Sequence, residues 1–310
     1  MQIICTGATG LVGYNFVKAA LSRGHKITAI CNSSDFPKME GVEVAKLDLS
    51  DFSAVERFFL DRFPEAIANC AAISSPSVVD KNPERARVLN VLLPEKLAML
   101  ANHMNSRLVH LSTDMVFDGS RAPYKNTDAP RPFNQYGQTK LEAETAVLKY
   151  AASQSVVLRI SHVCGRGLKQ NRSFDEKLFH CLARGEKYEQ PENEIKRFLP
   201  ASRVAELMTE LFERPNVSGI YHYCGLESLS RYEAARRICE KFGLDPQKYL
   251  EKKNLPKDAD FSLDMSCISS RVKTPAVNFA EILDEIEIPD ACLEWYQAQT
   301  GKTPIKRFKL

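Results

Sequence analysis

Tyr136 and Lys140 have the residue types of an acid–base pair, and their spacing places both on one face of a helix. A phenol with its ordinary pKa of about 10 is a slow proton donor and a poor base at neutral pH. A nearby ammonium stabilises the phenolate and lowers that pKa. The pair therefore predicts a tyrosine that passes a proton to a substrate carbonyl.

A second motif predicts a phosphate cradle. Three glycines with the spacing Gly-x-x-Gly-x-x-Gly follow the strand-like run Ile3-Ile4-Cys5 and open a helical pattern. Glycine permits a tight turn, a close pyrophosphate and a helix packed on the sheet. The N–H groups at the start of that helix then face the phosphates. The motif favours a dinucleotide cofactor over a structural turn, with contacts expected from Gly7, Thr9, Gly10, Leu11, Val12 and Gly13.

The elements that position these residues alternate between short apolar and longer amphipathic runs. Strands are predicted at residues 2–5, 26–31, 43–45, 66–69, 107–112 and 155–160. Helices are predicted between them, at residues 12–23, 53–63, 83–103 and 135–152. This alternation is typical of an α/β fold with a Rossmann-type, doubly wound parallel sheet.

The second half of the chain has a looser pattern and predicts a smaller, mixed α/β lobe. Helices are expected at residues 174–184, 201–213 and 232–242, and a strand at 219–224, with Ser230 and Glu233 as a capping box. We divide the chain into a dinucleotide-binding domain at 1–165 and a substrate-binding lobe at 166–310. Segments near 200–225 should return to the first domain. The lobe should close a cleft over the carboxyl ends of the strands.

Composition limits the partners. The chain has 310 residues, a net charge of +3 and only strand-sized apolar runs, so neither nucleic acid nor a membrane is indicated. The chain opens directly on a strand, which argues against a signal peptide. Nine scattered cysteines without a Cys-x-x-Cys pair predict free thiols in a reducing cytoplasm. Six histidines without ligand spacing predict no metal site. The basic stretch at 306–309 is interpreted as a solvated terminus.

The glycine motif has the form Thr-Gly-Ala-Thr-Gly-x-x-Gly and resembles that of the extended short-chain dehydrogenase/reductase family. The resemblance implies that Asp48 and Leu49 contact adenine and that Asn90 is a structural asparagine near the cofactor. It also places the turn Cys70, Ala71 and Ala72 along the cofactor. The family's third catalytic residue falls on Thr113, with Ser112 as the less favoured choice, and Lys140 would also hold the ribose.

The end of the second strand indicates which nicotinamide cofactor is bound. NAD sites usually place an acidic residue there to hold the ribose hydroxyls. This chain has Asn32, Ser33 and Ser34 instead, and neutral side chains tolerate a 2′-phosphate that a carboxylate would repel. The sequence therefore favours NADP(H) over NAD(H). Lys38 is the nearest later cation.

The string Ser-Thr-Asp-x-Val-Phe-Asp-Gly at 112–119 resembles the dTDP-4-dehydrorhamnose reductase branch in particular. That branch implies hydride transfer to C4 of a nucleotide-linked 4-keto-6-deoxy sugar, with protonation by Tyr136. Substrate contacts would fall on Asp114, Val116 and His162, although His162 fits a packed strand-end residue equally well. A nucleotide sugar is the expected partner, and a homodimer is compatible with the sequence.

Three other functions remain open. A dehydratase of this family usually has a Glu where this chain has Met115, which argues against dehydration. An NAD-dependent epimerase usually has the second-strand acid that is missing here. The chain also resembles the regulatory β subunit of methionine adenosyltransferase, which is not catalytic. The intact set of Thr113, Tyr136 and Lys140 favours an enzyme.

Overall fold

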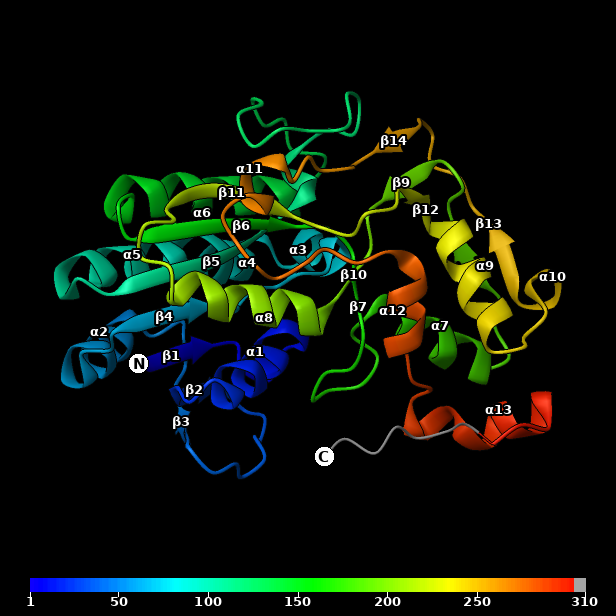
Figure 1. The fold of residues 1–310 in the computed structure, drawn as a ribbon, viewed down its shortest axis with the longest axis horizontal. Helices are drawn as coiled ribbons and strands as arrows, with labels where there is room; N and C mark the ends of the chain where they lie inside the picture. Colours follow the sequence, from blue (N-terminus) through cyan, green and yellow to red (C-terminus); the bar gives the residue numbers. More distant parts are fainter. Residues whose placement is uncertain (304–310) are drawn as a thin grey trace.

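The computed structural model describes residues 1–303, and its centre is a seven-stranded parallel sheet (Figure 1). The strand order is β11-β6-β5-β4-β1-β2-β3. The bounds are β1 (Gln2–Thr6), β2 (Lys26–Cys31), β3 (Val42–Lys46), β4 (Ala66–Asn69), β5 (Arg107–Thr113), β6 (Ser155–Ile160) and β11 (Gly219–Tyr223). The order reverses between β1 and β4, where a doubly wound sheet opens a crevice at its carboxyl ends. The predicted fold class is confirmed.

Helices cover both faces of the sheet (Figure 1). One face carries α2 (Phe52–Arg62), α5 (Leu93–Met104) and α6 (Gln135–Ala151), and the other carries α1 (Leu11–Ser22) and α8 (Ala201–Phe212). The helix predicted at 83–103 is divided into α4 (Pro83–Arg87), the π-helix η1 (Val88–Leu92) and α5. A π turn holds an extra residue, and it often marks a functional site. The short α3 (Pro76–Lys81) precedes α4.

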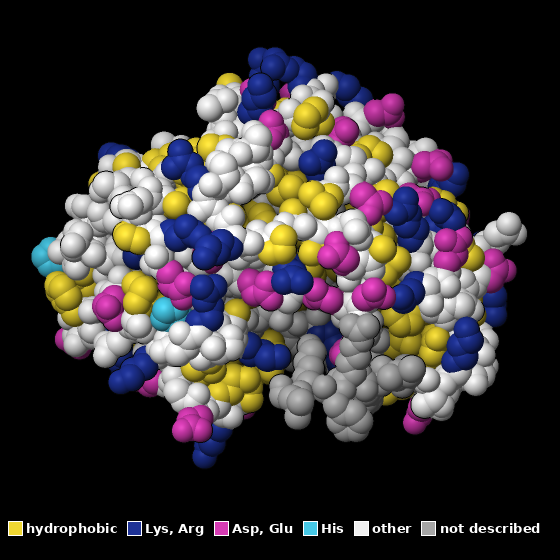
Figure 2. All heavy atoms as spheres, in the orientation of Figure 1, with side chains coloured by type: hydrophobic (Ala, Val, Ile, Leu, Met, Phe, Trp, Pro, Cys, Tyr) yellow, Lys and Arg dark blue, Asp and Glu magenta, His cyan; other side chains and the backbone are white. Residues whose placement is uncertain are grey.

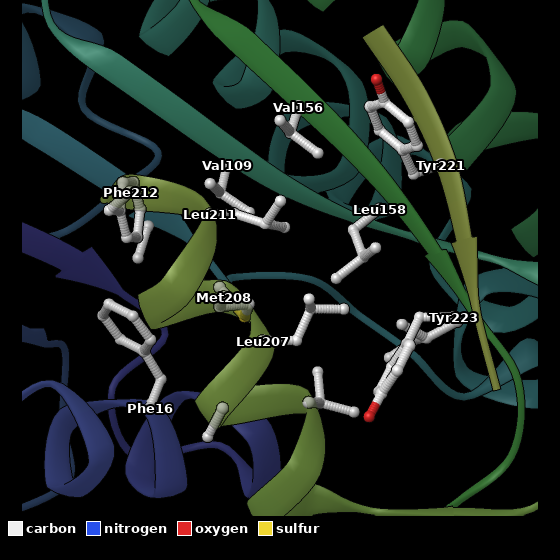
Figure 3. Packing of buried hydrophobic residues seen from close by; sticks show 14 of the residues in the cluster. Phe16, Val109, Val156, Leu158, Leu207, Met208, Leu211, Phe212, Tyr221 and Tyr223 are labelled. Carbon is white, nitrogen blue, oxygen red and sulfur yellow. The ribbon is translucent and has the colours of Figure 1, made fainter. Parts of the chain in front are cut away.

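The helix α8 and the strand β11 come from the second half of the chain but belong to the core of the sheet. Figure 3 shows Leu207, Met208 and Leu211 of α8 packed between Phe16 of α1 and the strands. All four side chains are fully buried. Burying a large apolar side chain contributes about 1.5–3 kcal/mol. The return of residues 201–223 to the large sheet is therefore a stabilising part of the fold.

A smaller lobe has its own apolar core and three small sheets. Its strands are β7 (Val163–Cys164), β8 (Tyr188–Gln190), β9 (Glu194–Lys196), β10 (Leu199–Pro200), β12 (Leu229–Ser230), β13 (Leu250–Lys252) and β14 (Ala259–Asp260). Its helices are α7 (Phe174–Ala183), α9 (Arg231–Lys241), α10 (Pro246–Tyr249), α12 (Phe279–Glu285) and α13 (Leu293–Thr300). The short α11 (Ser266–Ser269) packs instead against β11 of the large sheet. Two 3₁₀ turns complete the elements, η2 (Asp114–Val116) and η3 (Asp290–Cys292). The position of the domain boundary stays a prediction.

The predicted capping box of α9 is only half formed. Ser230 accepts the N–H of Glu233, but the Glu233 carboxylate binds Arg236 and Arg237 instead of returning to the cap. Arginines one turn along the helix compete successfully for that carboxylate. Reciprocal boxes occur at α7 and α12.

The loop between β5 and α6 joins the two parts of the molecule (Figure 1). The N–H of Tyr124 donates to Ser262, and the N–H of Asp260 donates to the carbonyl of Gly119. Figure 2 shows acidic and basic side chains interspersed over one face. No helix within residues 1–303 is long and apolar enough to cross a membrane. The basic stretch at 306–309 lies outside the described residues.

Candidate functional site

The glycine loop after β1 forms a cradle that only small residues fit. Gly7 has a φ of +65°, and a Cβ there would lie 2.7 Å from the backbone nitrogen of Ala71. A Cβ on Gly13 would lie 2.3 Å from the carbonyl oxygen of Gly7. The helix α1 begins at Leu11, and its N-cap residue Gly10 supplies no side-chain cap. The backbone N–H groups of the first turn are therefore directed to an anion, and the cradle fits a dinucleotide pyrophosphate.

The three predicted catalytic side chains lie at the carboxyl end of β5 and in the first turns of α6. Thr113 ends β5, and its hydroxyl accepts the N–H of Met115 at 3.2 Å. Tyr136 and Lys140 follow the cap Asn134, whose side chain accepts the N–H of Gly137 at 2.9 Å. The structure therefore brings Thr113 and Tyr136 together beside the cradle.

The pKa of Tyr136 differs from the sequence-based expectation. Burial raises this pKa first, the nearby Asp114 carboxylate raises it further, and the Thr113 hydroxyl, hydrogen-bonded to the phenol, lowers it. The prediction that Lys140 lowers it is not met, because the Lys140 ammonium is directed to His110. The phenol is therefore protonated at neutral pH, but its raised pKa makes it a weaker acid than the sequence led us to expect.

A buried polar row leads away from Lys140. Its Nζ lies 3.1 Å from Nε2 of His110, whose Nδ1 lies 2.9 Å from Nδ2 of Asn69. Thr6 Oγ1 then lies 2.7 Å from Oδ1 of Asn69. Burial lowers the pKa of Lys140 to about 8, although Glu144 and Cys70 oppose this shift. No sequence signal pointed to His110, because the register of the strands is not readable from the sequence.

The Ser112 side chain belongs to a different hydrogen-bond network. Its hydroxyl donates to Glu144, and Glu144 forms an ion pair with Arg159 at 2.6 Å in which both side chains are 2% exposed. Arg159 in turn lies 3.3 Å from Nε2 of His222 on β11. Thr113 is buried as well, and its hydroxyl donates to Asp114 at 3.2 Å, but it stands at the very end of β5 and stays the favoured candidate.

The residues predicted to select the cofactor lie where expected, at the end of β2. Asn32 and Ser33 are exposed there. The structure adds a cation that the sequence did not indicate. Lys46, at the end of β3, donates from Nζ to the carbonyl of Ser34 at 2.8 Å and lies 3.0 Å from Asp35. A cation from the neighbouring parallel strand therefore lies at Ser34, in addition to Lys38 further along the loop.

The other predicted cofactor residues surround the crevice. Asp48 accepts the N–H and hydroxyl of Ser50, and these bonds lower its pKa. Leu49 packs against the core under α2. The turn of Cys70, Ala71 and Ala72 follows β4 and crosses Gly7.

Asn90 lies in the π-helix and is fully buried. Its side chain binds both backbone groups of Ile73 and donates to Thr139 of α6 at 3.1 Å. It thus ties the turn after β4 to the helix that carries Tyr136. This arrangement agrees with a structural role.

Two of the three predicted substrate residues pack against apolar side chains. Val116 is fully buried in the core beside Phe117, so contact with a sugar is contradicted for this side chain. His162 packs edge-on against Phe174 and Phe198, and burial holds its pKa well below the usual range. Packing thus accounts for His162.

Asp114, the third of these residues, is buried in a link between the two parts of the molecule. It accepts from Ser161 at 2.8 Å and from Lys196 of β9 at 3.0 Å. The Lys196 side chain is itself only 1% exposed. The sequence did not single out Lys196, because its partner lies 82 positions away.

A separate hollow of about 460 Å³ lies at the ends of α1 and α8. It is lined by Arg23, Glu210, Glu213, Arg214, Lys273 and Thr274. Its charges are largely paired with one another, as in the contact of 2.6 Å between Glu210 and Arg214. No predicted site residue lines it. Within residues 1–303, no group of three His, Cys, Asp or Glu side chains could hold a metal ion.

A doubly wound sheet with this cradle beside a Tyr-x-x-x-Lys helix defines an extended short-chain dehydrogenase/reductase fold. Within that class, the chain belongs to the family described as the RmlD substrate binding domain, whose model matches residues 1–270.

Known proteins agree with this assignment. The chain is 34% identical to methionine adenosyltransferase 2 subunit beta of Xenopus laevis, over 80% of this chain and 74% of the relative. It is 30% identical to the solved structure of a hypothetical dTDP-4-dehydrorhamnose reductase from Sulfolobus tokodaii, with a TM-score of 0.80 over 93% of this chain and all of that chain. A dTDP-4-dehydrorhamnose reductase from Bacillus anthracis in complex with NADP has the same fold at 20% identity, with a TM-score of 0.76 over 91% and 96% of the two chains.

Proposed function

We propose that this protein reduces the C4 keto group of a nucleotide-linked 4-keto-6-deoxy sugar with NADPH. One observation carries the proposal: Tyr136 and Thr113 lie close together at the carboxyl end of β5, where burial and Asp114 raise the pKa of the phenol and keep it protonated. A protonated acid next to a hydroxyl donor is what a carbonyl needs as it becomes an alcohol.

Each residue of the site has a separate task. The N–H groups at the start of α1 bind the pyrophosphate of the cofactor, which supplies a hydride when bound. Thr113 donates a hydrogen bond to the substrate oxygen and stabilises the negative charge that develops there. Tyr136 transfers its hydroxyl proton to that oxygen. Lys140 holds the ribose of the bound cofactor.

The choice of substrate rests on likeness to known reductases, and the choice of cofactor rests on charge as well. Lys46 beside Ser34 suits a 2′-phosphate. The structural neighbours named above include reductases of this kind, one of them bound to NADP.

A second candidate is a cofactor-binding regulatory subunit without turnover. The 34% identity to methionine adenosyltransferase 2 subunit beta favours it. In that case the cradle would bind a dinucleotide to stabilise an interface with a catalytic partner.

The test is NADPH and NADH oxidation against a panel of nucleotide 4-keto sugars. We expect NADPH-dependent turnover that falls at least about a hundredfold in Tyr136→Phe, a typical acid–base contribution. Tyr150→Phe, the same change further along α6, is the matched control and should keep full turnover. Tight NADPH binding with no turnover on any sugar, together with capture of a methionine adenosyltransferase catalytic subunit, would favour the regulatory function instead.

A further inference from the structure

Three strands carry matching polar residues on the sheet face that α6 covers. In the strand register Thr6 pairs with Asn69, and Asn69 pairs with His110. The three side chains therefore lie side by side across β1, β4 and β5, and Lys140 reaches the end of this row from α6. None of the four residues is more than 2% exposed. Such a row is expected to be fully hydrogen-bonded.

The protonation state of Lys140 determines which ring nitrogen of His110 carries the proton. Burial and the nearby Lys140 hold the pKa of His110 well below its usual range, so the ring is neutral and carries one N–H. An ammonium has donors only. When Lys140 is charged, Nε2 of His110 must accept, and the ring proton lies on Nδ1. When Lys140 is neutral, Nε2–H donates to Nζ, and Nδ1 accepts from Asn69.

The Asn69 amide can serve both states. With Nδ2 toward His110, it donates to Nδ1 and accepts from Thr6, which matches a neutral Lys140. Rotated by half a turn, its oxygen accepts from Nδ1–H and its nitrogen donates to Thr6, which matches a charged Lys140. The Thr6 hydroxyl also accepts the N–H of Ala71 at 3.4 Å, so the row ends beneath the glycine cradle.

Both states of Lys140 are within reach near neutral pH. Burial is the largest influence on its ammonium, and it lowers the pKa to about 8. Two groups oppose this effect, Glu144 one turn further along α6 and Cys70 in the turn after β4. His110 faces Nζ from β5.

We propose that His110 is a positioning residue that fixes Lys140 Nζ, and that its ring changes tautomer whenever Lys140 gains or loses its proton. On deprotonation, one proton leaves Nζ for solvent. The ring keeps a single proton, which is exchanged from Nδ1 to Nε2, and the Asn69 amide rotates. The inference rests on the proposed function only in giving Lys140 a place at the reacting centre.

The experiment follows the ring nitrogens of His110 by two-bond ¹H–¹⁵N correlation in protein labelled with ¹⁵N-histidine, assigned with His110→Gln. We expect Nδ1–H at low pH and Nε2–H at high pH, with a midpoint near the Lys140 pKa of about 8 and no imidazolium signal. Lys140→Met should abolish the transition. Lys149→Met, an exposed lysine of the same helix, should leave it unchanged. A constant tautomer in the unmodified protein, or a transition that survives Lys140→Met, would overturn the proposal.

Kinetics supply a second readout. Gln at position 110 still offers an acceptor to Lys140, whereas Leu does not. We expect His110→Gln to keep kcat within about threefold, and His110→Leu to lose tenfold or more with a pH midpoint lowered by about one unit, since a charged hydrogen bond is lost. Equal kcat and pH profiles in the two variants would count against the positioning role. If no sugar is reduced but the tautomer changes with Lys140, the proposed function fails and this inference stands.

Discussion

The carbonyl oxygen of Met115 lies 2.0 Å from the position that an ideal Cβ on Gly137 would take. The same oxygen accepts the N–H of Phe133 at 3.1 Å. The start of α6 is therefore pressed against the turn that follows β5. This contact sets the distance between Tyr136, the residue before Gly137, and Thr113, two residues before Met115.

Gly137→Ala should damage the site more than the fold. The new methyl group collides with backbone, so α6 must move away from η2. We expect a loss of stability of about 1–3 kcal/mol, typical of overpacking, and a fall in turnover of about a hundredfold, because small misplacements weaken catalysis strongly. Thermal unfolding and turnover measure the two effects. Gln138→Ala, at an exposed position beside it, is the control, and full activity in Gly137→Ala would refute the idea.

Substitutions of Ser112 and Thr113 should have different effects: the first should lower stability, and the second should lower turnover. Ser112→Ala removes a buried donor to Glu144, so we expect a loss of about 1–3 kcal/mol in the free energy of unfolding with turnover largely kept. Thr113→Val should retain stability within about 1 kcal/mol but lower kcat/KM by about a hundredfold or more. Thr113→Ser should restore most activity. If Ser112→Ala lost turnover and Thr113→Val kept it, the catalytic role would belong to Ser112.

Lys140→Met should stabilise the protein while abolishing turnover. Folding lowers the pKa of Lys140 from 10.5 to about 8, so the unfolded chain binds more protons between these values and stability rises with pH there. Below about pH 8 the buried charge destabilises the folded state, and removing it should contribute on the order of 2 kcal/mol. The gain should shrink above pH 8 and vanish near 10.5. Melting temperatures over this range test it, with Lys149→Met as control; a gain that is constant with pH would contradict it.

Lys46→Ala should weaken NADPH binding without weakening NADH binding. Lys46 Nζ lies at the backbone of Ser34, whereas Lys38 is exposed further along the loop. Loss of an exposed cation near a phosphate should lower NADPH affinity about fivefold. Titration of cofactor fluorescence gives both dissociation constants. If Lys38→Ala produces the loss and Lys46→Ala does not, the expectation based on chain order is the correct one.

The first half of the fold was predictable because its signals are local. The strands β2 and β6 end where the apolar runs end, and each is followed by a polar residue. The glycine loop and the Tyr-x-x-x-Lys pair also depend only on spacing along the chain. The π turn at Val88–Leu92 was not predictable, since one extra residue in a turn has no residue type or motif of its own in the sequence.

What the sequence could not provide was contact between distant segments. His110 reads as part of an apolar strand until Asn69 and Lys140 are placed beside it. The role of Lys196 can be recognised only from its ion pair with Asp114. The strands of the smaller lobe were missed for another reason: those of two or three residues are too short for a period of two to emerge.

The position of β11 at the edge of the sheet has a consequence for how the protein is made. Thr113, Tyr136 and Lys140 leave the ribosome early, but the outer edge of β6 stays unpaired until residue 223 of 310 has been synthesised. All six residues of β6 are buried in the finished fold. During that interval the nascent chain presents an open, apolar edge, which is a template for mispairing. A fragment that ends after β6 would thus contain Thr113, Tyr136 and Lys140 and still be prone to aggregate.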